Sequence, residues 1–400
     1  DLSKRQGLHH RIGSILYAYY KEDNSALKKN VFDICFHLNH GQRFIDQHEN
    51  VVDLIGLNLQ AAQQAKQSAA YTVALDYILN AITLLDNKIN QPLVELSFSV
   101  FREAAECAYL CGELNRTEQY LNSAVEFVGN NYQQCQLINL RIVQLVSTGD
   151  YVQSMEWGYK SLNLYGVELP DAKNEAEVNQ YFEDKQRAFL DDWIGSGKTI
   201  SDLYDLPVNQ DPEIGLLMEL LGSLYASALM SFPDYLKVIT IALVDLSIKH
   251  GNTPVSPIAY AWHGSVIAAI SHDYDDAYAF GELAIRLNEQ KIHNPTIACK
   301  IYNMVGNFIA YFKDSLRKTL PILRRAYDFG MTSGDKLYGG YSIINELRNT
   351  LSTGIPLNTW LKLDDEVKLK LEQCDADVMV EVRESFRSYV LQMMGESKFA

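Results

Sequence analysis

Residues 58–85 read NLQAAQQAKQSAAYTVALDYILNAITLL, and this stretch decides the fold class. Small side chains let two helix axes approach closely, while tyrosine and leucine side chains fill the space between them. The stretch therefore predicts two closely packed helices, the unit from which helical-hairpin repeats build a continuous core. The residues at helical spacing that carry this prediction are Ala61, Ala65, Ala69 or Ala70, Tyr71, Ala74, Tyr77 and Ala81.

The same pattern occurs three more times, around residues 103–125, 145–162 and 271–287. Gly112 and Gly149 are 37 residues apart, close to the period of about 34 residues in tetratricopeptide repeats. The match to that repeat is degenerate and does not reach its consensus. We expect further repeat-packing roles for Ala108, Gly112, Gly149, Ala277, Gly281 and Ala284.

Length and composition agree with a folded helical protein. The 400 residues are 47% hydrophobic and 21% charged, which is typical of a chain with a sizeable core. Repeats of about 34 to 40 residues would place about ten hairpins in this length. No hydrophobic alternation requires a sheet. We therefore predict an all-α protein, a helical-hairpin repeat solenoid that forms a tetratricopeptide-like superhelix.

The helical pattern breaks most clearly between residues 166 and 212, around one predicted helix at 175–193. Glycine, proline and short polar residues are concentrated there, and these residue types mark turns and loops. We predict an N-terminal helical-repeat array at 1–165, an irregular joint with one helix at 166–212, and a C-terminal helical-repeat array at 213–400.

The charge and hydropathy of the chain argue against two kinds of partner, nucleic acids and membranes. The formal charge of -15 repels a phosphate backbone, so we predict no nucleic-acid partner. The strongest basic cluster, between Lys313 and Arg325, has spacings that fit a solvated helix face as well as a docking patch. The most apolar segment, 216–232, has 17 residues and is interrupted by Glu219, short of the about 20 that a membrane span needs. We predict no membrane insertion.

The cysteines and the start of the sequence give two further expectations. The six cysteines show no paired framework, and Cys107 and Cys111 lie one helical turn apart in an apolar pattern. Buried, reduced thiols fit this pattern better than a redox sensor, so we expect a cytoplasmic location. The sequence starts at Asp1 without a methionine, and helical patterning begins almost at once. We expect an excised piece of a longer polypeptide.

One short segment resembles a nucleotide-binding motif. Residues 195–199, GSGKT, match the end of a phosphate-binding loop, but the full motif needs glycine at position 192, where Asp192 stands. A phosphate-binding loop also follows a buried strand, whereas this segment follows a helical pattern. We interpret it as a flexible polar turn.

Histidines near the N-terminus raise the question of a metal site. His37 and His40 are three residues apart, with His9, His10 and His48 nearby. Zinc ligands on a helix usually form an i, i+4 pair with further ligands in support, so this spacing favours packing or exposure. No arrangement of Ser, His and Asp suggests a catalytic centre. We predict no catalytic residue, no metal and no cofactor.

Nine short segments occur along the chain in an order that indicates a protein family more specifically than any single segment does. They are LHHRIG at 8–13, HLN at 37–39, the stretch 58–85, EAAECAYLCG at 103–112, WGYKSLNLYGVELP at 157–170, LYDLPVNQDP at 203–212, HGNTPVSPIAYAWHG at 250–264, DDAYAFGELAIRL at 275–287 and LPILRRAYDFGMTSGD at 320–335. Together they resemble the helical region that follows the ATPase core in large multidomain signalling proteins. These are STAND ATPases of the apoptosis-regulator-like class, joined to Ser/Thr-kinase-like, sensor and histidine-kinase domains of two-component systems.

The resemblance implies a non-catalytic scaffold or sensor arm. Such an arm would bind a protein domain, either the ATPase or kinase of the same chain or a separate protein or peptide, and so regulate the attached enzyme. A ligand can shift closed and open populations only if it binds the two states with different affinity. Exposed tyrosines on the concave surface would be suitable anchors. Two alternatives remain: a free-standing helical-repeat adaptor or transcription-regulator sensor module, and an enzyme of unrecognised type.

Overall fold

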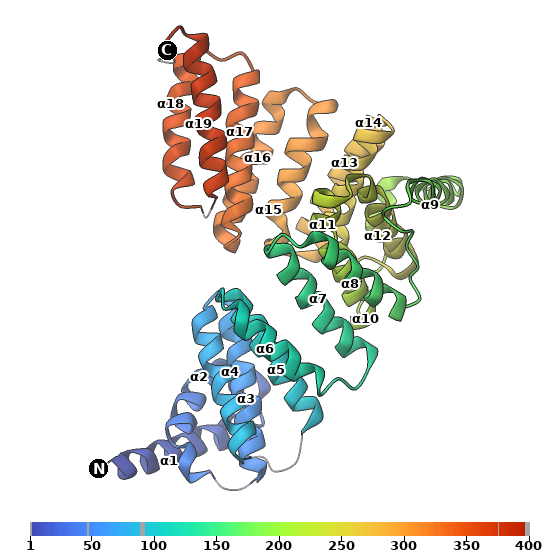
Figure 1. Ribbon diagram of the computed structural model, residues 1–400. Coiled ribbons are helices and arrows are strands. Elements are labelled where there is room, and N and C mark those ends of the chain that lie inside the picture. The colour runs from blue at the N-terminus through green and yellow to red at the C-terminus, as the bar shows by residue number, and fades with distance from the viewer. Residues whose placement is uncertain (1, 46–47, 89–92, 375, 397–400) are drawn as a thin grey trace. The chain divides into compact units, whose positions relative to one another are not determined.

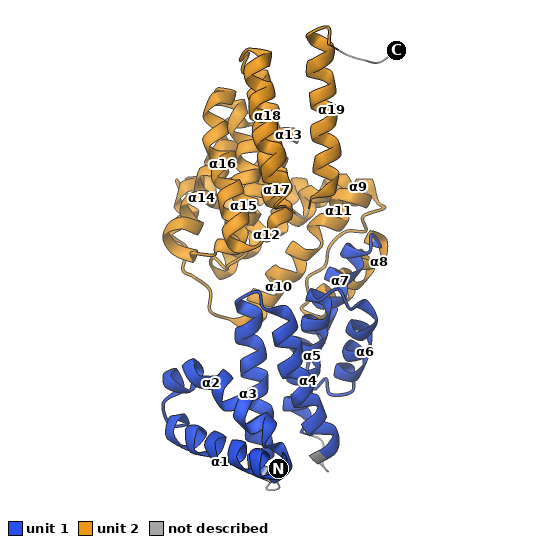
Figure 2. Ribbon diagram, turned by 90° about the vertical axis from the view of Figure 1, so that its left-hand side faces the viewer, with its two compact units in different colours: residues 1–150 blue, residues 151–400 orange. Residues whose placement is uncertain are grey.

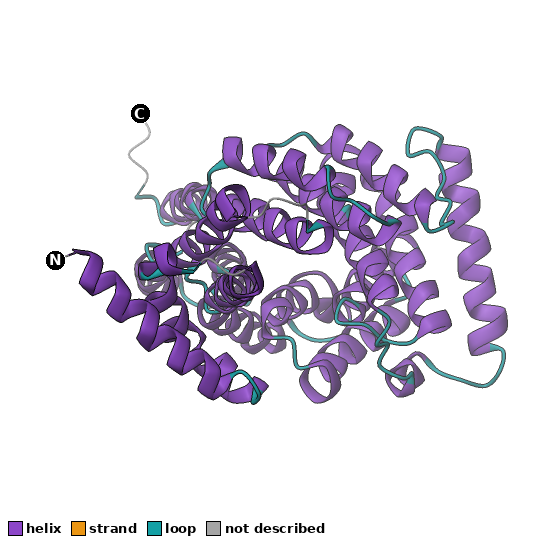
Figure 3. Ribbon diagram, turned by 90° about the horizontal axis from the view of Figure 1, so that it is seen from below, coloured by secondary structure: helices purple, strands orange, loops and turns teal. Residues whose placement is uncertain are grey.

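The computed structural model is helical throughout, which confirms the predicted all-α class (Figure 1). The structure describes residues 2–45, 48–88, 93–374 and 376–396. Within these residues helices and loops account for the fold, and no strand forms (Figure 3). The nearest approach to a sheet there is an isolated parallel bridge between Val208 and Asn252.

The chain divides into two compact units, Asp1–Asp150 and Tyr151–Ala400 (Figure 2). This division differs from the predicted one, because the segment 166–212 lies wholly inside the second unit. The helix predicted at 175–193 is present as α9, Glu175–Ala188, which continues into a π-helix at Phe189–Ile194.

The first unit contains seven α-helices in its described residues, and those that follow each other in pairs pack most closely: α1 with α2, α3 with α4, and α5 with α6. A short 3₁₀ helix at Gln42–Phe44 precedes α3. The helices are α1 (Leu2–Tyr20), α2 (Asn24–His40), α3 (His48–Gln67), α4 (Tyr71–Lys88), α5 (Val94–Leu110), α6 (Leu114–Val125) and α7 (Asn131–Ser147).

Small residues lie in the core where α3 and α4 pack together. Ala61 on α3 and both Ala74 and Ala81 on α4 are completely buried in the same cluster, and small side chains there allow a close approach of helices. Ala65 belongs to the same core. Tyr77 is half-buried against it, with its ring 5.7 Å from that of Phe32. Ala108 on α5 extends the core, and Tyr71 is half-buried at the start of α4.

Three residues that were predicted to pack between helices lie instead in turns. The three turns share the same backbone conformation and hydrogen-bond pattern. Ala69, Gly112 and Gly149 have φ values of 57°, 77° and 80°, the left-handed conformation that ends a helix. Ala69 is exposed, and a Cβ at either glycine would meet no atom within 4 Å. Their role is therefore to reverse the chain, not to bring helices together. The closing hydrogen bonds run from Ala70 N to Ala65 O, Glu113 N to Ala108 O and Asp150 N to Leu145 O, each 2.9 Å.

The second unit contains the remaining helices of the described chain, several of them irregular. Three π-helical turns, at Phe189–Ile194, Asn288–Ile292 and Val305–Ile309, interrupt its helical pattern. Short 3₁₀ helices lie at Ile200–Asp205, Pro233–Tyr235 and Ala310–Phe312. The α-helices are α8 (Tyr151–Leu164), α9, α10 (Pro212–Ser223), α11 (Tyr225–Ser231), α12 (Leu236–His250), α13 (Ser256–Ile270), α14 (Tyr274–Leu287), α15 (Pro295–Met304), α16 (Leu316–Ser333), α17 (Lys336–Ser352), α18 (Leu357–Leu371) and α19 (Asp377–Met393).

Small residues also set two helix contacts in this unit. Ala277 and Ala284 on α14 are buried, and a Cβ added to Gly281 would lie 3.2 Å from Ile309 Cγ2. On α16, a Cβ added to Gly330 would lie 2.8 Å from the Cα of Gly339 on α17. The backbones of α16 and α17 are therefore in direct contact, which only glycine permits at that point.

One stretch, Pro212–Ser231, is long and apolar enough to cross a membrane by length and composition alone. This finding differs from the expectation based on the shorter segment 216–232. A core helix of a soluble protein passes the same test. In this structure the stretch is divided into α10 and α11, and leucines of α10 are buried in the second unit.

Candidate functional site: a pocket beside Tyr159

The GSGKT segment forms a polar turn, as predicted. It follows the π-helix Phe189–Ile194 and leads into a 3₁₀ helix, so the strand that precedes a phosphate-binding loop is absent from this described part of the chain. Trp193 Nε1 donates to Thr199 O at 2.9 Å, and Lys198 Nζ lies 4.2 Å from the centroid of the Trp193 ring. Asp202 accepts hydrogen bonds from the backbone and hydroxyl of Thr199, which closes the turn.

The N-terminal histidines pack between α1 and α2. The Nδ1 atoms of His9 and His37 are 3.0 Å apart, and the His9 and His40 rings stack with centroids 5.1 Å apart. Burial, and then the nearby His37 and His40, lower the pKa of His9. Among the described residues, no group of three or more His, Cys, Asp or Glu could hold a metal ion. The side chain of His48 lies outside the described residues.

Most of the cysteines are buried free thiols. No disulfide joins the six, all of which lie in the described chain, and all are buried except the half-buried Cys111. Burial raises the pKa of Cys35, Cys107 and Cys299 to about 12, which keeps these thiols protonated and poorly nucleophilic at neutral pH.

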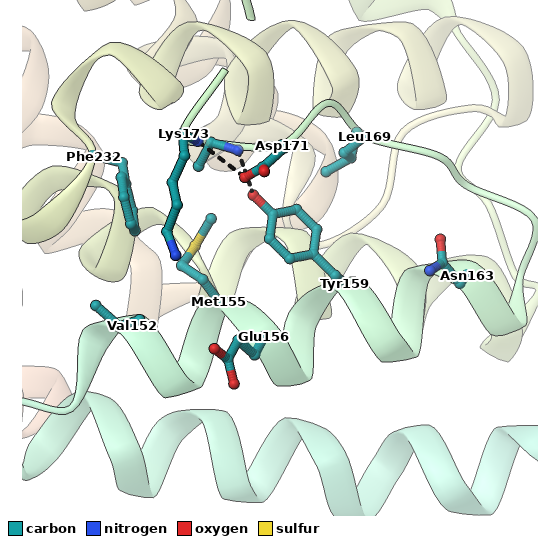
Figure 4. A pocket seen from close by; sticks show the side chains of 10 residues that line it. Val152, Met155, Glu156, Tyr159, Asn163, Leu169, Asp171, Lys173 and Phe232 are labelled. Atoms are coloured by element: carbon teal, nitrogen blue, oxygen red, sulfur yellow. Dashed lines mark hydrogen bonds between the residues drawn. The ribbon is translucent and has the colours of Figure 1, made fainter. Parts of the chain in front are cut away.

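A pocket of about 360 Å³ lies on the second unit, and we call it the Tyr159 pocket (Figure 4). Its walls come from α8, from the loop that follows α8, and from Phe232 just after α11. Apolar groups form much of the lining, and Glu156, Asp171 and Lys173 contribute charged groups. The apolar lining consists of Val152, Met155, Leu169, Phe232 and the ring of Tyr159.

The sequence of α8 explains one wall of the pocket. Val152, Met155, Tyr159 and Asn163 recur every three or four residues, so their side chains share one face of the helix. Gly166, with φ 68°, then reverses the chain and lets the following loop return over that face.

Two tyrosines hold this loop in place. Tyr159 Oη accepts a hydrogen bond from Ala172 N at 3.2 Å, and Tyr235 Oη donates to Pro170 O at 2.7 Å. The two rings meet edge to face with centroids 6.2 Å apart. The pocket is therefore fixed by hydrogen bonds before any ligand arrives, which reduces the entropy lost on binding.

The pocket contains one neutral phenol and three exposed charged side chains. Burial raises the pKa of Tyr159, so its phenol is neutral and serves as a hydrogen-bonding group. Glu156, Asp171 and Lys173 are exposed and retain contact with water. An apolar hollow with a few polar groups is the usual form of a site that takes one apolar side chain or a small ligand.

None of the pocket residues was singled out from the sequence. Tyr159, Asn163 and Leu169 fall in the segment 157–170, which carried part of the family resemblance, but no role was assigned to them. The spacing of Val152, Met155 and Tyr159 along α8, continued by Asn163, is the signal that could have shown one wall of the pocket.

Comparison with known proteins shows a distant similarity to a signalling protein. No family model matches the chain. The chain is similar to the hybrid signal transduction histidine kinase G of Dictyostelium discoideum, with 20% identity over 436 residues. The alignment covers 98% of this chain and 12% of that protein, so the chain spans about an eighth of the length of the relative it matches. This similarity supports the histidine-kinase element of the resemblance drawn from the sequence.

Proposed function

We propose that this chain is a non-catalytic region of a larger signalling protein, in which it recognises a protein domain or ligand and regulates an attached ATPase or kinase. The observation that carries the proposal is the alignment of 98% of this chain with only 12% of a signal transduction histidine kinase. Such coverage is expected of one region within a longer chain. A cytoplasmic location and an attached STAND ATPase are parts of the same proposal.

We also propose that the helices form a tetratricopeptide-like repeat superhelix. Its support is the close packing of successive helix pairs in the first unit and the shared construction of the turns at Ala69, Gly112 and Gly149. Stacked hairpins of this kind present extended binding surfaces.

The Tyr159 pocket is the proposed recognition site. An apolar side chain from a partner would lie against Met155 and Phe232, with its neighbouring polar groups near Asp171 and Lys173. Binding regulates the attached enzyme if the conformation of the loop over the pocket differs between the enzyme's two states. The partner then binds one state more tightly than the other and shifts the population toward it.

Calorimetry with MgATP tests the absence of catalytic function in this region. We expect no saturable heat from the isolated chain. Saturable binding that disappears in Lys198→Ala would overturn the proposal and restore the enzyme alternative. An immunoblot of the native polypeptide distinguishes a region of a larger protein from a free-standing adaptor. A band far above 45.3 kDa would indicate a region of a larger protein, and a band near that mass would indicate a free-standing adaptor.

A substitution at the pocket tests its role in regulation. Val152→Arg places a charge at the exposed edge of the Tyr159 pocket and should leave the fold intact, because this side chain is 45% exposed. In the full-length parent, we expect altered autophosphorylation. Val125→Arg, at a 60% exposed position outside the pocket, is the matched control. Equal autophosphorylation in both variants and the parent would remove the pocket from the proposal.

A further inference from the structure

Four aromatic rings form a continuous exposed row on the second unit. The Tyr274 and Phe312 rings stack with centroids 4.5 Å apart, and Tyr311 lies 4.3 Å from Phe312. His272 extends the row at 6.2 Å from Tyr274. We call these four residues the aromatic row.

The backbone explains why these rings face solvent. The π-helix Val305–Ile309 runs directly into the 3₁₀ helix Ala310–Phe312, and this change of helical pitch alters which residues face inward. Ile309 and Ala310 are buried, whereas Phe308, Tyr311 and Phe312 are 46%, 38% and 37% exposed. The aliphatic residues of this segment thus enter the core, and its aromatic residues do not.

An exposed aromatic cluster of this kind is costly in a free protein. Each partly exposed ring gives up hydrophobic stabilisation that burial would supply. Clustered exposed apolar side chains, unlike scattered ones, mark interaction surfaces, and tyrosine and phenylalanine are enriched in the centres of such surfaces.

Charge around the row indicates the kind of partner. Asp273, Asp275 and Asp276 flank Tyr274 at the start of α14, which places three carboxylates beside the row. Burial, and then repulsion by Asp273 and Asp275, raise the pKa of Asp276. Two lysines face the same region and are already paired: Lys313 lies 2.7 Å from Asp275, and Lys318 lies 2.6 Å from Asp314.

We propose that the aromatic row is a docking surface for a basic peptide segment of a partner protein. Arginine or lysine side chains would lie over the rings in cation–π contacts, and the carboxylates of Asp273 and Asp276 would pair with the charges that remain. The row shares no residue with the Tyr159 pocket, so this proposal goes beyond the proposed function and can fail without it.

Fluorescence anisotropy with two labelled peptides tests the proposal. One dodecapeptide contains arginine, glycine and proline, and the other has glutamate in place of each arginine. We expect the basic peptide to bind the chain, to bind more weakly as salt rises, and to lose about tenfold in affinity in Tyr311→Ser/Phe312→Ser. Tyr274→Ser provides a second variant should the double variant fail to fold.

The control is Val378→Ser, which removes a 64% exposed apolar side chain on α19, away from the aromatic row in sequence. It should bind the basic peptide like the unmodified chain. Three results would overturn the proposal: no binding of the basic peptide, equal binding of the acidic peptide, or equal binding in both aromatic variants. Self-association that is lost in those variants would also overturn it, since the occupant would then be a second copy of this chain.

Discussion

Arg383 on α19 and Asp364 on α18 form an ion pair that is shielded from water. Their side chains are 2% and 0% exposed, and Arg383 Nη2 lies 2.5 Å from Asp364 Oδ2. Arg383 Nε also donates to the backbone oxygen of Asp364 at 3.3 Å, and Arg387 bonds to the same carboxylate from the next turn of α19. The pair fixes the last helix to its neighbour, because a buried charge that loses its partner is strongly disfavoured.

Arg383→Met should destabilise the chain by about 3 to 5 kcal/mol, since it leaves Asp364 buried with only Arg387 in support. Urea denaturation followed by circular dichroism measures this change. Arg387→Met should cost less, because the Arg387 side chain is 29% exposed. Equal losses in the two variants would mean that burial does not set the strength of this network.

Ala74→Leu and Ala81→Leu should each destabilise the first unit by about 1 to 3 kcal/mol, because added methylene groups overpack the contact between α3 and α4. Both alanines are completely buried. Val73→Leu is the control on the same helix at an exposed position, and its melting temperature should be unchanged. Unchanged melting in both alanine variants would show that the register of α3 and α4 is wrong.

Ala69→Gly should stabilise the chain by about 0.5 to 1 kcal/mol, because alanine is strained at the positive φ of this turn and glycine is not. Gly149→Ala places the same strain in the equivalent turn and should destabilise by a similar amount. Thermal denaturation of the two variants provides the measurement. A shift of both in the same direction would contradict the shared construction of these turns.

Glu346→Gln should stabilise the chain increasingly as pH rises. Glu346 is 6% exposed, and burial outweighs the ion pair with Arg324 and raises its pKa above the ordinary value. Between the ordinary glutamate pKa and the higher pKa that Glu346 has in the folded state, the folded chain binds more protons than the unfolded chain. The free energy of unfolding of the unmodified chain therefore falls as pH rises through this range. Glutamine does not titrate.

The measurement is the difference in melting temperature between Glu346→Gln and the unmodified chain, taken at several values between about pH 4 and pH 7. This difference should grow with pH. Glu366→Gln, an exposed position near Glu346 in the cleft of α16, α17 and α18, serves as the control and should show no such trend. A difference that shrinks with pH would mean that the ion pair outweighs burial.

Local spacing predicted the helices and part of their packing. The alanines of α3 and α4 repeat at helical intervals, so their shared face could be read directly from residues 58–85. Ala69 continues the same spacing, but the helix ends at Gln67, and no glycine marks the left-handed residue of this turn. Gly112 and Gly149 were recognised as equivalent, yet periodicity alone could not distinguish a turn glycine from a packing glycine.

The two proposed recognition surfaces could not be predicted for a different reason. The Tyr159 pocket joins α8 to Phe232, about 70 residues later in the chain, and no local pattern encodes that approach. The aromatic row depends on a π-helix that shifts the inward face of the segment after Met304, whereas sequence reading assumes regular helical periodicity.

The pairing of consecutive helices in the first unit also has a kinetic consequence. Contacts between α1 and α2, α3 and α4, and α5 and α6 join residues that are near in the chain, so each closes only a short loop. Little chain entropy is lost before each contact forms, and proteins with such low contact order fold quickly. We therefore expect the first unit to assemble hairpin by hairpin during synthesis, before the second unit has left the ribosome.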